Sequence, residues 1–156
     1  MKKKIAILGS TGSIGKTTFD IIKKDKKNFD VILLTTHKNI KELYKQSKIL
    51  NVKNLIVTDT KSYINLKNKI KNKETKIFNN YNNLNQILKK KLDYTMSSIS
   101  GLAGLQPTLM IIGKTKTIAI ANKESIICGW SLIDKKLKKH KTKFIPVDSE
   151  HFSIWS

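Results

Sequence analysis

Short apolar runs alternate with segments of helical spacing along all 156 residues of the chain. The runs are rich in β-branched residues, and apolar side chains on successive positions predict strands that are buried on both faces. We expect strands at residues 4–8, 30–35, 54–57, 76–78, 94–99, 117–121 and 144–148. Strands that alternate with helices form βαβ units with right-handed crossovers. The alternation therefore predicts an α/β fold with a mostly parallel sheet and helices on both faces.

Apolar residues at intervals of three and four positions mark the faces of the expected helices that pack on the sheet. The clearest sets are Ile40, Leu43 and Tyr44; Leu84, Ile87 and Leu88; and Ile126, Ile127, Trp130 and Ile133. A further helix, expected after the glycine-rich segment that follows the first strand, holds Ile14, Ile21 and Ile22.

A glycine-rich segment, GSTGSIG, begins at Gly9 after the first expected strand and leads into the first helix. Gly9 permits a tight turn, Gly12 lets backbone N–H groups approach a pyrophosphate, and Gly15 lets the helix pack closely on the sheet. Thr11 and Ser13 add hydroxyl donors, and the helix N-terminus supplies positive potential. A tight connection that binds nothing would use similar glycines, but the flanking strand and helix favour dinucleotide binding. They predict a Rossmann-like, doubly wound sheet.

The end of the second expected strand bears on the choice of dinucleotide. NAD-binding domains usually place an Asp or Glu there, about 20 residues beyond the glycines, to accept a hydrogen bond from the ribose 2′-OH. This chain instead reads LLTTHKN, in which His37, Lys38 and Asn39 offer cationic or donor groups and no carboxylate. The sequence therefore favours NADP over NAD, although Lys38 is also explained as one more surface lysine.

Lysine dominates the charge of the chain. Lys and Arg together number 31 against 11 Asp and Glu, so the formal net charge is +20. A protein this basic attracts phosphates, and a nucleic-acid-binding protein is therefore an alternative. The sequence contains no arginine, however, and arginine dominates specific base contacts. The lysines are scattered over nearly every surface segment, which favours a solvated surface, and no nucleic acid partner is expected.

Cys128 is the single cysteine, so an internal disulfide is excluded and a reducing, cytoplasmic setting is expected. It lies within the apolar segment SIICGW, where we expect a core position rather than the nucleophile of a semialdehyde-type dehydrogenase. No segment approaches the roughly 20 apolar residues of a membrane span, and the apolar run after MKKK is too short for a secretion signal. We expect a soluble protein with no membrane partner.

Two polar clusters follow later strands, where the ligands of open α/β sheets gather. The segment IANKES places Asn122, Lys123 and Glu124 at a strand-to-helix turn, which fits either helix capping or a ligand site. The segment PVDSEH contains Asp148 and Glu150, which point to the same face of an extended strand because they are two positions apart. Hard carboxylate oxygens on one face suit Mg²⁺ or Mn²⁺.

The segments GSTGSIG, NKES and PVDSEH occur in an order and at separations that resemble the amino-terminal part of the 1-deoxy-D-xylulose 5-phosphate reductoisomerase family. The intervening piece SSISGLAGLQPTL is similar as well, so the resemblance covers essentially the whole chain. It implies an enzyme, an NADPH- and metal-dependent oxidoreductase that converts 1-deoxy-D-xylulose 5-phosphate to 2-C-methyl-D-erythritol 4-phosphate for isoprenoid precursors. The implied partner is a small sugar phosphate, and the implied full-length enzyme is a homodimer.

The resemblance also implies cofactor roles for individual residues. Residues implied to hold the pyrophosphate are Thr11, Gly12, Ser13 and Ile14. Residues implied to lie by the adenosine phosphate are Lys38 and Asn39, and those implied to touch the cofactor nearer the nicotinamide are Asn122 and Glu124.

Substrate and metal roles follow from the same resemblance. Lys123 is implied to contact the substrate, and Asp148 and Glu150 are implied to bind Mg²⁺ or Mn²⁺. Ser149 and Glu150 are implied to meet the sugar. The implied catalytic residues are therefore Lys123, Asp148 and Glu150.

The chain departs from the family at His37, where glycine is usual, and we expect this change to make cofactor contact at that turn less secure. Family members continue beyond the matching part with a lid, a further metal-binding glutamate and a helical domain. We therefore expect residues 1–145 to form an NADPH-binding Rossmann-like domain and residues 146–156 to begin the catalytic region. A truncated chain of this extent is expected to be inactive alone, and an inactive nucleotide-binding remnant is an alternative.

Overall fold

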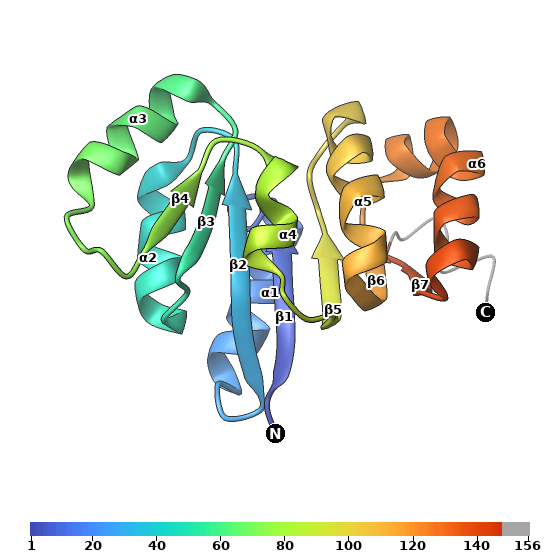
Figure 1. Ribbon diagram of the computed structural model, residues 1–156, viewed down its shortest axis with the longest axis horizontal. Coiled ribbons are helices and arrows are strands. Elements are labelled where there is room, and N and C mark those ends of the chain that lie inside the picture. Colours follow the sequence, from blue (N-terminus) through green and yellow to red (C-terminus); the bar gives the residue numbers. More distant parts are fainter. Residues whose placement is uncertain (148–156) are drawn as a thin grey trace.

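The computed structural model describes residues 1–147. Within them, one sheet has the order β4-β3-β2-β1-β5-β6-β7, and every neighbouring pair of strands is parallel (Figure 1). The strands are β1 (Lys3–Leu8), β2 (Phe29–Thr36), β3 (Asn54–Val57), β4 (Lys76–Phe78), β5 (Leu92–Ser97), β6 (Thr115–Ile120) and β7 (Lys143–Pro146). The predicted α/β, Rossmann-like parallel sheet is confirmed. Each expected strand is present with ends within two residues of the prediction, except that Asp148 lies outside the described residues.

Helices connect the strands. Those of the described chain are α1 (Ser13–Lys24), α2 (Ile40–Leu50), α3 (Thr60–Lys69), α4 (Leu84–Ile87), α5 (Leu105–Ile111) and α6 (Lys123–His140), with short 3₁₀ turns η1 (Tyr81–Asn83), η2 (Leu102–Gly104) and η3 (Ile112–Lys114). Asn39, Asp59 and Asn122 cap α2, α3 and α6, because each side chain accepts the backbone N–H three residues further on. None of these helices combines the length and apolar character that a membrane span requires.

The position of β1 in the middle of the sheet determines where a ligand site can form. The chain builds the sheet outward from β1 to β4 and then returns to place β5 on the other side of β1. The direction of strand addition therefore reverses between β1 and β5. In open α/β sheets, such a switch point leaves a crevice at the carboxyl ends of the strands, where ligands bind.

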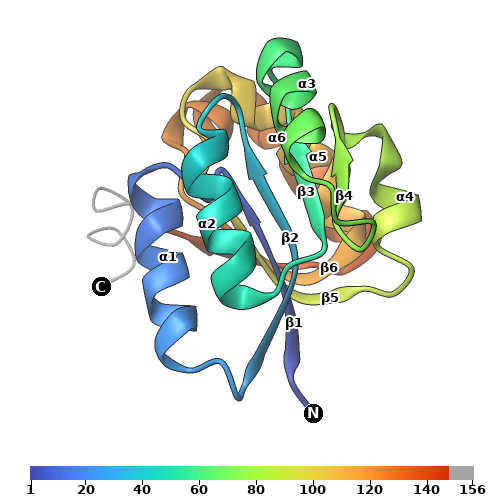
Figure 2. The same ribbon diagram turned by 90° about the vertical axis from the view of Figure 1, so that its left-hand side faces the viewer.

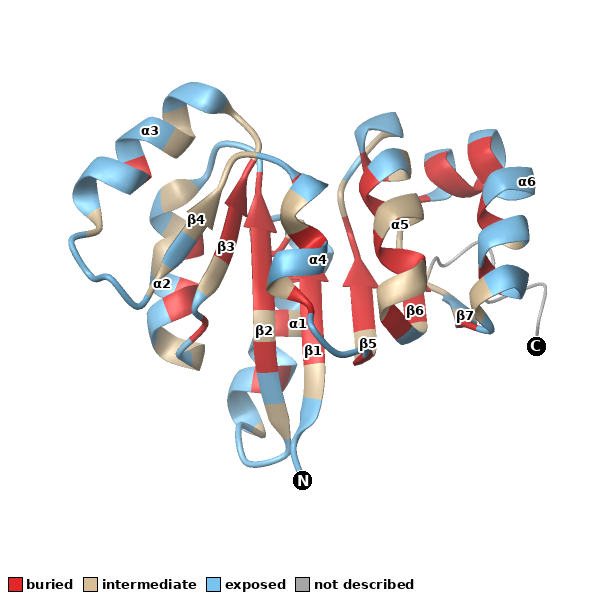
Figure 3. Cartoon of the chain, viewed as in Figure 1, coloured by how far each residue is buried: buried red, intermediate tan, exposed pale blue. Residues whose placement is uncertain are grey.

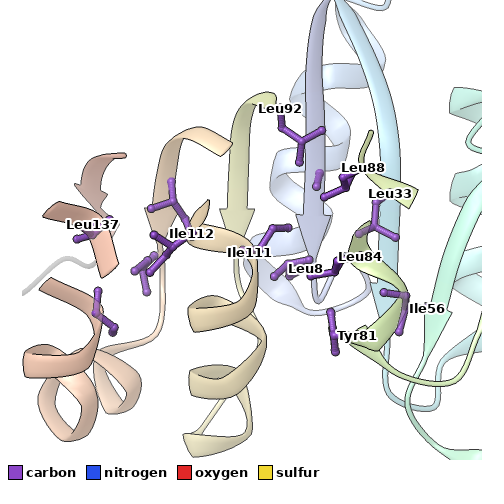
Figure 4. Close-up of a cluster of buried hydrophobic side chains, with 14 of the residues drawn as sticks. Leu8, Leu33, Ile56, Tyr81, Leu84, Leu88, Leu92, Ile111, Ile112 and Leu137 are labelled. Carbon is purple, nitrogen blue, oxygen red and sulfur yellow. The ribbon is translucent and has the colours of Figure 1, made fainter. Parts of the chain in front are cut away.

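The sheet is buried on both faces, because neighbouring residues of a strand point to opposite sides. Ile7 and Leu34 belong to the core on the side of α1, α2 and α3, where Ile22 packs. Leu8 and Leu33 belong to the core on the side of α4, α5 and α6 (Figure 4). Figure 2 shows α1 and α2 on one side of the central strands and α4 on the other, and Figure 3 shows burial concentrated in β1, β2, β3 and β5.

The buried stripe of α6 differs from the expected one. Ile126 is buried as expected, but Ile127 is 73% exposed and Trp130 is 42% exposed. The stripe includes Gly129 instead, where an added Cβ atom would lie 2.3 Å from Leu105 Cδ1. Because this glycine lets α6 approach α5 closely, the buried face contains a residue without a side chain, which the spacing of large apolar residues does not reveal.

The expected core position of Cys128 is wrong, since this thiol is exposed. Two residues along a helix correspond to a rotation of about 200°, so Cys128 lies nearly opposite the buried Ile126. In α1, Ile21 is 61% exposed, whereas Phe19 and Ile22 form the face that packs on the sheet. The intervals between isoleucines therefore predicted the helices correctly but assigned some side chains to the wrong face.

Candidate functional site

A cleft of about 350 Å³ lies at the switch point, at the carboxyl ends of β1, β2, β3 and β5. Its walls come from the glycine-rich loop after β1, the ends of β2 and β3, the turn η1 and the loop after β5. Residues on these walls include Gly9, Thr11, Gly12, Thr36, His37, Thr58, Tyr81, Ser98 and Ile99. Segments that are far apart in the sequence thus converge where the topology of the sheet favours a ligand.

The glycine-rich loop has the geometry that two of its glycines predict. Gly9 has a φ of +74°, a left-handed conformation, and an added Cβ atom would lie 2.9 Å from the backbone oxygen of Ser98. An added Cβ atom at Gly15 would lie 2.1 Å from the backbone oxygen of Gly9. The tight turn at Gly9 and the close packing of α1 at Gly15 are therefore confirmed.

The N-terminus of α1 meets the cleft without a capping side chain. Gly12 is the N-cap residue, it makes no side-chain hydrogen bond, and the first turn contains no acidic residue. No group within residues 1–147 accepts a hydrogen bond from the backbone N–H of Ser13 or Ile14. Free N–H groups and the positive end of the helix dipole both favour an anion. The arrangement therefore suits a phosphate group.

Thr35 of β2 holds the glycine-rich loop from the inside. Its Oγ1 accepts hydrogen bonds from the backbone N–H of Gly9 and from the hydroxyl of Tyr81, both at 2.9 Å. Burial raises the pKa of Tyr81 to about 12, although the hydrogen bond to Thr35 acts in the opposite direction. The phenol therefore stays protonated at neutral pH and keeps its donor role.

Further contacts fix the same loop to its surroundings. Thr11 Oγ1 and Thr36 Oγ1 lie 2.6 Å apart, within hydrogen-bond distance. Gln46 Nε2 of α2 donates to the backbone oxygen of Ser10 at 2.9 Å. A hydroxyl has one donor and two acceptor positions, so Thr11 keeps capacity for a further partner. The protein alone thus holds the loop in shape.

His37, Lys38 and Asn39 directly follow β2, as predicted, and all three are exposed. His37 lies on the cleft wall, and its Nδ1 is 2.9 Å from Thr58 Oγ1. Asn39 Oδ1 accepts the backbone N–H of Glu42, so part of this side chain is used to cap α2. No Asp or Glu of the described chain lies on the cleft wall, which removes a source of repulsion for phosphate.

Asn122 has its polar side-chain atoms engaged within the protein. The residue is 3% exposed. Its Nδ2 donates to the backbone oxygens of Ile99 and Gly101, and its Oδ1 accepts the backbone N–H of Ser125. Asn122 therefore fastens the start of α6 to the loop after β5, whose residue Ile99 lies on the cleft wall.

The other predicted site residues are separate from the described cleft walls. Lys123 and Glu124 are exposed in the first turn of α6. The predictions for Asp148, Ser149 and Glu150 fall outside the described residues. Within residues 1–147, no cluster of three or more His, Cys, Asp or Glu side chains could hold a metal ion.

Sequence reasoning missed three residues that shape the cleft, namely Thr35, Tyr81 and Ser98. Ser98 Oγ donates to the backbone oxygen of Leu8 at 2.8 Å, which joins the ends of β1 and β5. The available signal was weak: Thr35 and Ser98 are hydroxyl residues at the ends of apolar strands. Tyr81 lies in the polar segment NNYNN, which carries no signal of a buried contact.

A protein-family model described as 1-deoxy-D-xylulose 5-phosphate reductoisomerase matches residues 5–129. The chain belongs to this family. The reductoisomerase of Pelagibacter ubique (strain HTCC1062) is 62% identical over 156 residues, which cover 99% of this chain and 40% of that protein. The reductoisomerase of Clostridium kluyveri (strain NBRC 12016) is 38% identical over 156 residues, covering 98% of this chain and 40% of that protein. The chain therefore spans about 40% of the length of these relatives.

Solved structures of reductoisomerases have the same fold over the matching part. The Zymomonas mobilis reductoisomerase in complex with NADPH superposes with a TM-score of 0.88 at 36% identity, covering 97% of this chain and 40% of that one. A reductoisomerase in complex with NADPH, fosmidomycin and magnesium gives a TM-score of 0.85 at 32% identity, covering 96% of this chain and 37% of that one. Beyond the family, the Staphylococcus aureus homoserine dehydrogenase shares the fold alone, with a TM-score of 0.53 at 17% identity.

Proposed function

We propose that this chain is the NADPH-binding part of a 1-deoxy-D-xylulose 5-phosphate reductoisomerase. In the whole protein, the reaction would convert 1-deoxy-D-xylulose 5-phosphate to 2-C-methyl-D-erythritol 4-phosphate with NADPH and a divalent metal. The observation that carries the proposal is the uncapped N-terminus of α1, which opens into the switch-point cleft of a chain that belongs to this family. Two similar reductoisomerases have been solved with NADPH bound.

The pyrophosphate is proposed to be held by Thr11, Gly12, Ser13 and Ile14. The residues present fit this group, since the N–H groups of Ser13 and Ile14 have no acceptor among the described residues. Space is available too, because a Cβ atom built at Gly12 would meet only the backbone oxygen of Gly9, at 3.6 Å. Donors that are already in position bind an anion without a cost of ordering.

The adenosine phosphate is proposed to lie by Lys38 and Asn39, which favours NADPH over NADH. Asn39 Oδ1 is used to cap α2, so the amide donors of this side chain are the groups left for a ligand. The lysine supplies a point charge for a phosphate. The lack of Asp and Glu on the described cleft walls supports the same preference.

At the opposite end of the cofactor, Asn122 and Glu124 are proposed to lie next to the nicotinamide. Lys123 is proposed to contact the substrate. The engaged side chain of Asn122 supports a role in which its backbone and the loop that it fastens face the cofactor. When bound, NADPH supplies a hydride to the aldehyde that the rearrangement produces. The protein groups at this end position the sugar phosphate, and positioning alone can contribute about 7–11 kcal/mol to a barrier.

The divalent metal, Mg²⁺ or Mn²⁺, is proposed to be bound by Asp148 and Glu150, and the sugar by Ser149 and Glu150. These residues lie beyond the described chain, so the support is the family resemblance of PVDSEH and the preference of hard cations for carboxylate oxygens. A metal bound there would polarise the substrate carbonyl. We propose residues 1–145 as the NADPH-binding domain and 146–156 as the start of the catalytic region, in an enzyme that is a homodimer at full length.

Titration of the chain with NADPH, followed by nicotinamide fluorescence, tests the proposal. We expect saturable binding that is tighter for NADPH than for NADH, and no NADPH oxidation when a polypeptide of these 156 residues receives 1-deoxy-D-xylulose 5-phosphate and Mn²⁺. A full-length reductoisomerase from a relative is the positive control for turnover. Absence of NADPH binding would refute the proposal, and binding of random duplex DNA that NADPH does not displace would favour the nucleic-acid-binding alternative.

A further inference from the structure

His37 occupies a position from which it can contact the adenosine end of a bound dinucleotide. It directly follows β2, and its side chain lies on the cleft wall with Thr36 and Thr58. In Rossmann-like domains, the carboxyl end of the second strand lies beside the ribose 2′ position of the adenosine. The imidazole therefore stands where an NAD-binding domain places a carboxylate.

The ring of His37 is within hydrogen-bond distance of a residue that follows the neighbouring strand β3. Its Nδ1 lies 2.9 Å from Oγ1 of Thr58, which directly follows β3. Because that contact occupies one ring nitrogen, Nε2 is the nitrogen left for a ligand, and no described residue contacts it through a hydrogen bond. A side chain that is already oriented loses less conformational entropy when it binds.

The charges next to His37 are one cation, Lys38, which favours a phosphate over a hydroxyl group, and one carboxylate, Asp59. Lys38 is adjacent in the chain and exposed. The acidic group at this turn, Asp59, caps α3, and its Oδ2 accepts hydrogen bonds from the backbone N–H and the hydroxyl of Ser62 at 2.9 and 2.7 Å. The carboxylate of Asp59 is therefore bound to the start of α3, and the backbone N–H of Asp59 donates to the backbone oxygen of His37 at 3.1 Å.

We infer that the His37 imidazole contacts the phosphate on the adenosine 2′ position and so makes His37 a residue that selects NADPH over NADH. This inference rests on the proposed function and assigns to the chain a selectivity contact that is additional to Lys38. It also reverses the expectation drawn from sequence, in which His37 made contact at this turn less secure. The contact between His37 Nδ1 and Thr58 Oγ1 is the observation that supports the inference.

The affinities of two cofactor fragments distinguish a contact of His37 with the 2′-phosphate from other effects of its substitution. Isothermal titration with adenosine 2′,5′-bisphosphate and with adenosine 5′-monophosphate compares ligands that differ only in the 2′-phosphate. We expect His37→Ala to weaken the bisphosphate about tenfold, the value for a lost hydrogen bond to a charged group, while the monophosphate changes less than about twofold. Thr58→Val, which removes the partner of Nδ1, should lower the same selectivity ratio by a smaller factor.

A charge control and the opposing outcomes complete the experiment. Lys61→Ala removes an exposed positive charge from the start of α3, and we expect it to leave the selectivity ratio unchanged. Equal weakening of both fragments by His37→Ala would overturn the inference, because it would indicate stacking on adenine or disorder of the turn. Unchanged affinities for both fragments would also overturn it. If the unaltered chain binds neither fragment, the proposed function fails first, a result distinct from both.

Discussion

The hydroxyl of Tyr81 donates to Thr35 Oγ1 at 2.9 Å, and the same oxygen accepts the backbone N–H of Gly9. Tyr81 belongs to η1, which follows the edge strand β4, whereas Gly9 follows the central strand β1. The segment beyond the edge of the sheet therefore helps to hold the glycine-rich loop. Loss of this support should alter the cleft without changing any residue of the loop itself.

We expect Tyr81→Phe to lower the free energy of unfolding by about 1 kcal/mol, the net value of one buried hydrogen bond. The affinity for NADPH should fall a few-fold, because the Thr35 side chain is then free to turn away from Gly9. Urea unfolding and NADPH titration measure the two effects. Tyr94→Phe is the matched control, since the half-buried Tyr94 hydroxyl bonds none of the described residues. Identical behaviour of the two variants would contradict the role assigned to Tyr81.

A carboxylate at position 12 should separate stability from nucleotide binding. Gly12 has extended backbone angles, φ −78° and ψ 178°, which any residue adopts. Gly12→Asp and Gly12→Asn should both cap α1 and raise the free energy of unfolding by a few tenths of a kcal/mol, because glycine is already an accepted N-cap residue. We expect the Gly12→Asp variant to bind NADPH at least about tenfold more weakly than the Gly12→Asn variant. Only the aspartate places a negative charge at the proposed pyrophosphate site. Equal NADPH affinities of the two variants would argue against an anion at the N-terminus of α1.

Asn122→Ala should be more destabilising than the loss of an ordinary helix cap. The substitution removes the cap of α6 and leaves the backbone oxygens of Ile99 and Gly101 without their donor. We expect a loss of about 2–3 kcal/mol in the free energy of unfolding. Asn39→Ala removes an exposed cap alone and should cost about 1 kcal/mol. Urea unfolding of both variants checks the difference, and similar losses would mean that the loop after β5 does not depend on Asn122.

The free energy of unfolding should depend on pH through the carboxylate of Asp93. Its carboxylate accepts hydrogen bonds from Lys116 Nζ and from the backbone N–H of Lys4, both at 2.8 Å. The hydrogen bond from Lys116, and then that from Lys4, hold the pKa of Asp93 below its ordinary value of 3.8. A lowered folded-state pKa gives stability that is complete above pH 3.8 and is lost as the pH falls through the lowered value.

The corresponding variant is Asp93→Asn. At pH 7 it should be less stable than the unaltered chain by no more than about 1 kcal/mol, because the ion pair lies at the surface. As the pH falls below 3.8 and through the lowered pKa, the difference should shrink, because Asp93 becomes protonated and the unaltered chain then also lacks the charge. Urea unfolding at pH 7, 5 and 3 tests this, with Asp20→Asn on the exposed side of α1 as control. A difference that stays constant over this range would exclude a contribution from the charge of Asp93.

The strands were predictable because each contains a short run of apolar or β-branched residues, and the glycine-rich loop because its conformation requires glycine at Gly9 and Gly15. The face of α6 was not predictable from its isoleucines. Its orientation depends on Gly129, which packs against Leu105 of another helix, and no pattern within α6 indicates that partner. Contacts between helices depend on shape, whereas the periodicity of one helix reports only the average position of its apolar residues.

The candidate site likewise has residues that could be predicted from the sequence and contacts that could not. Thr11 and Gly12 were predicted from the loop itself, and they lie on the cleft wall. The bond from Tyr81 to Thr35 could not be predicted, because it joins two segments whose proximity exists only in the assembled sheet. Asn122 was predicted to touch a cofactor, but its side chain also fastens a loop, a function that depends on the position of Ile99.

The central position of β1 affects how the chain assembles during synthesis. Strands β1 to β4 leave the ribosome first and are already neighbours in the final order, so this half of the sheet can form early. One edge of β1 then stays open until β5 emerges and the backbone N–H of Ser98 bonds the oxygen of Leu8. A nascent chain that stalls before residue 92 therefore exposes the open edge of β1, at which a foreign strand can add. Until Ser98 and Ile99 arrive, the cleft also lacks the wall that the loop after β5 supplies, so it forms only when both halves of the sheet have met.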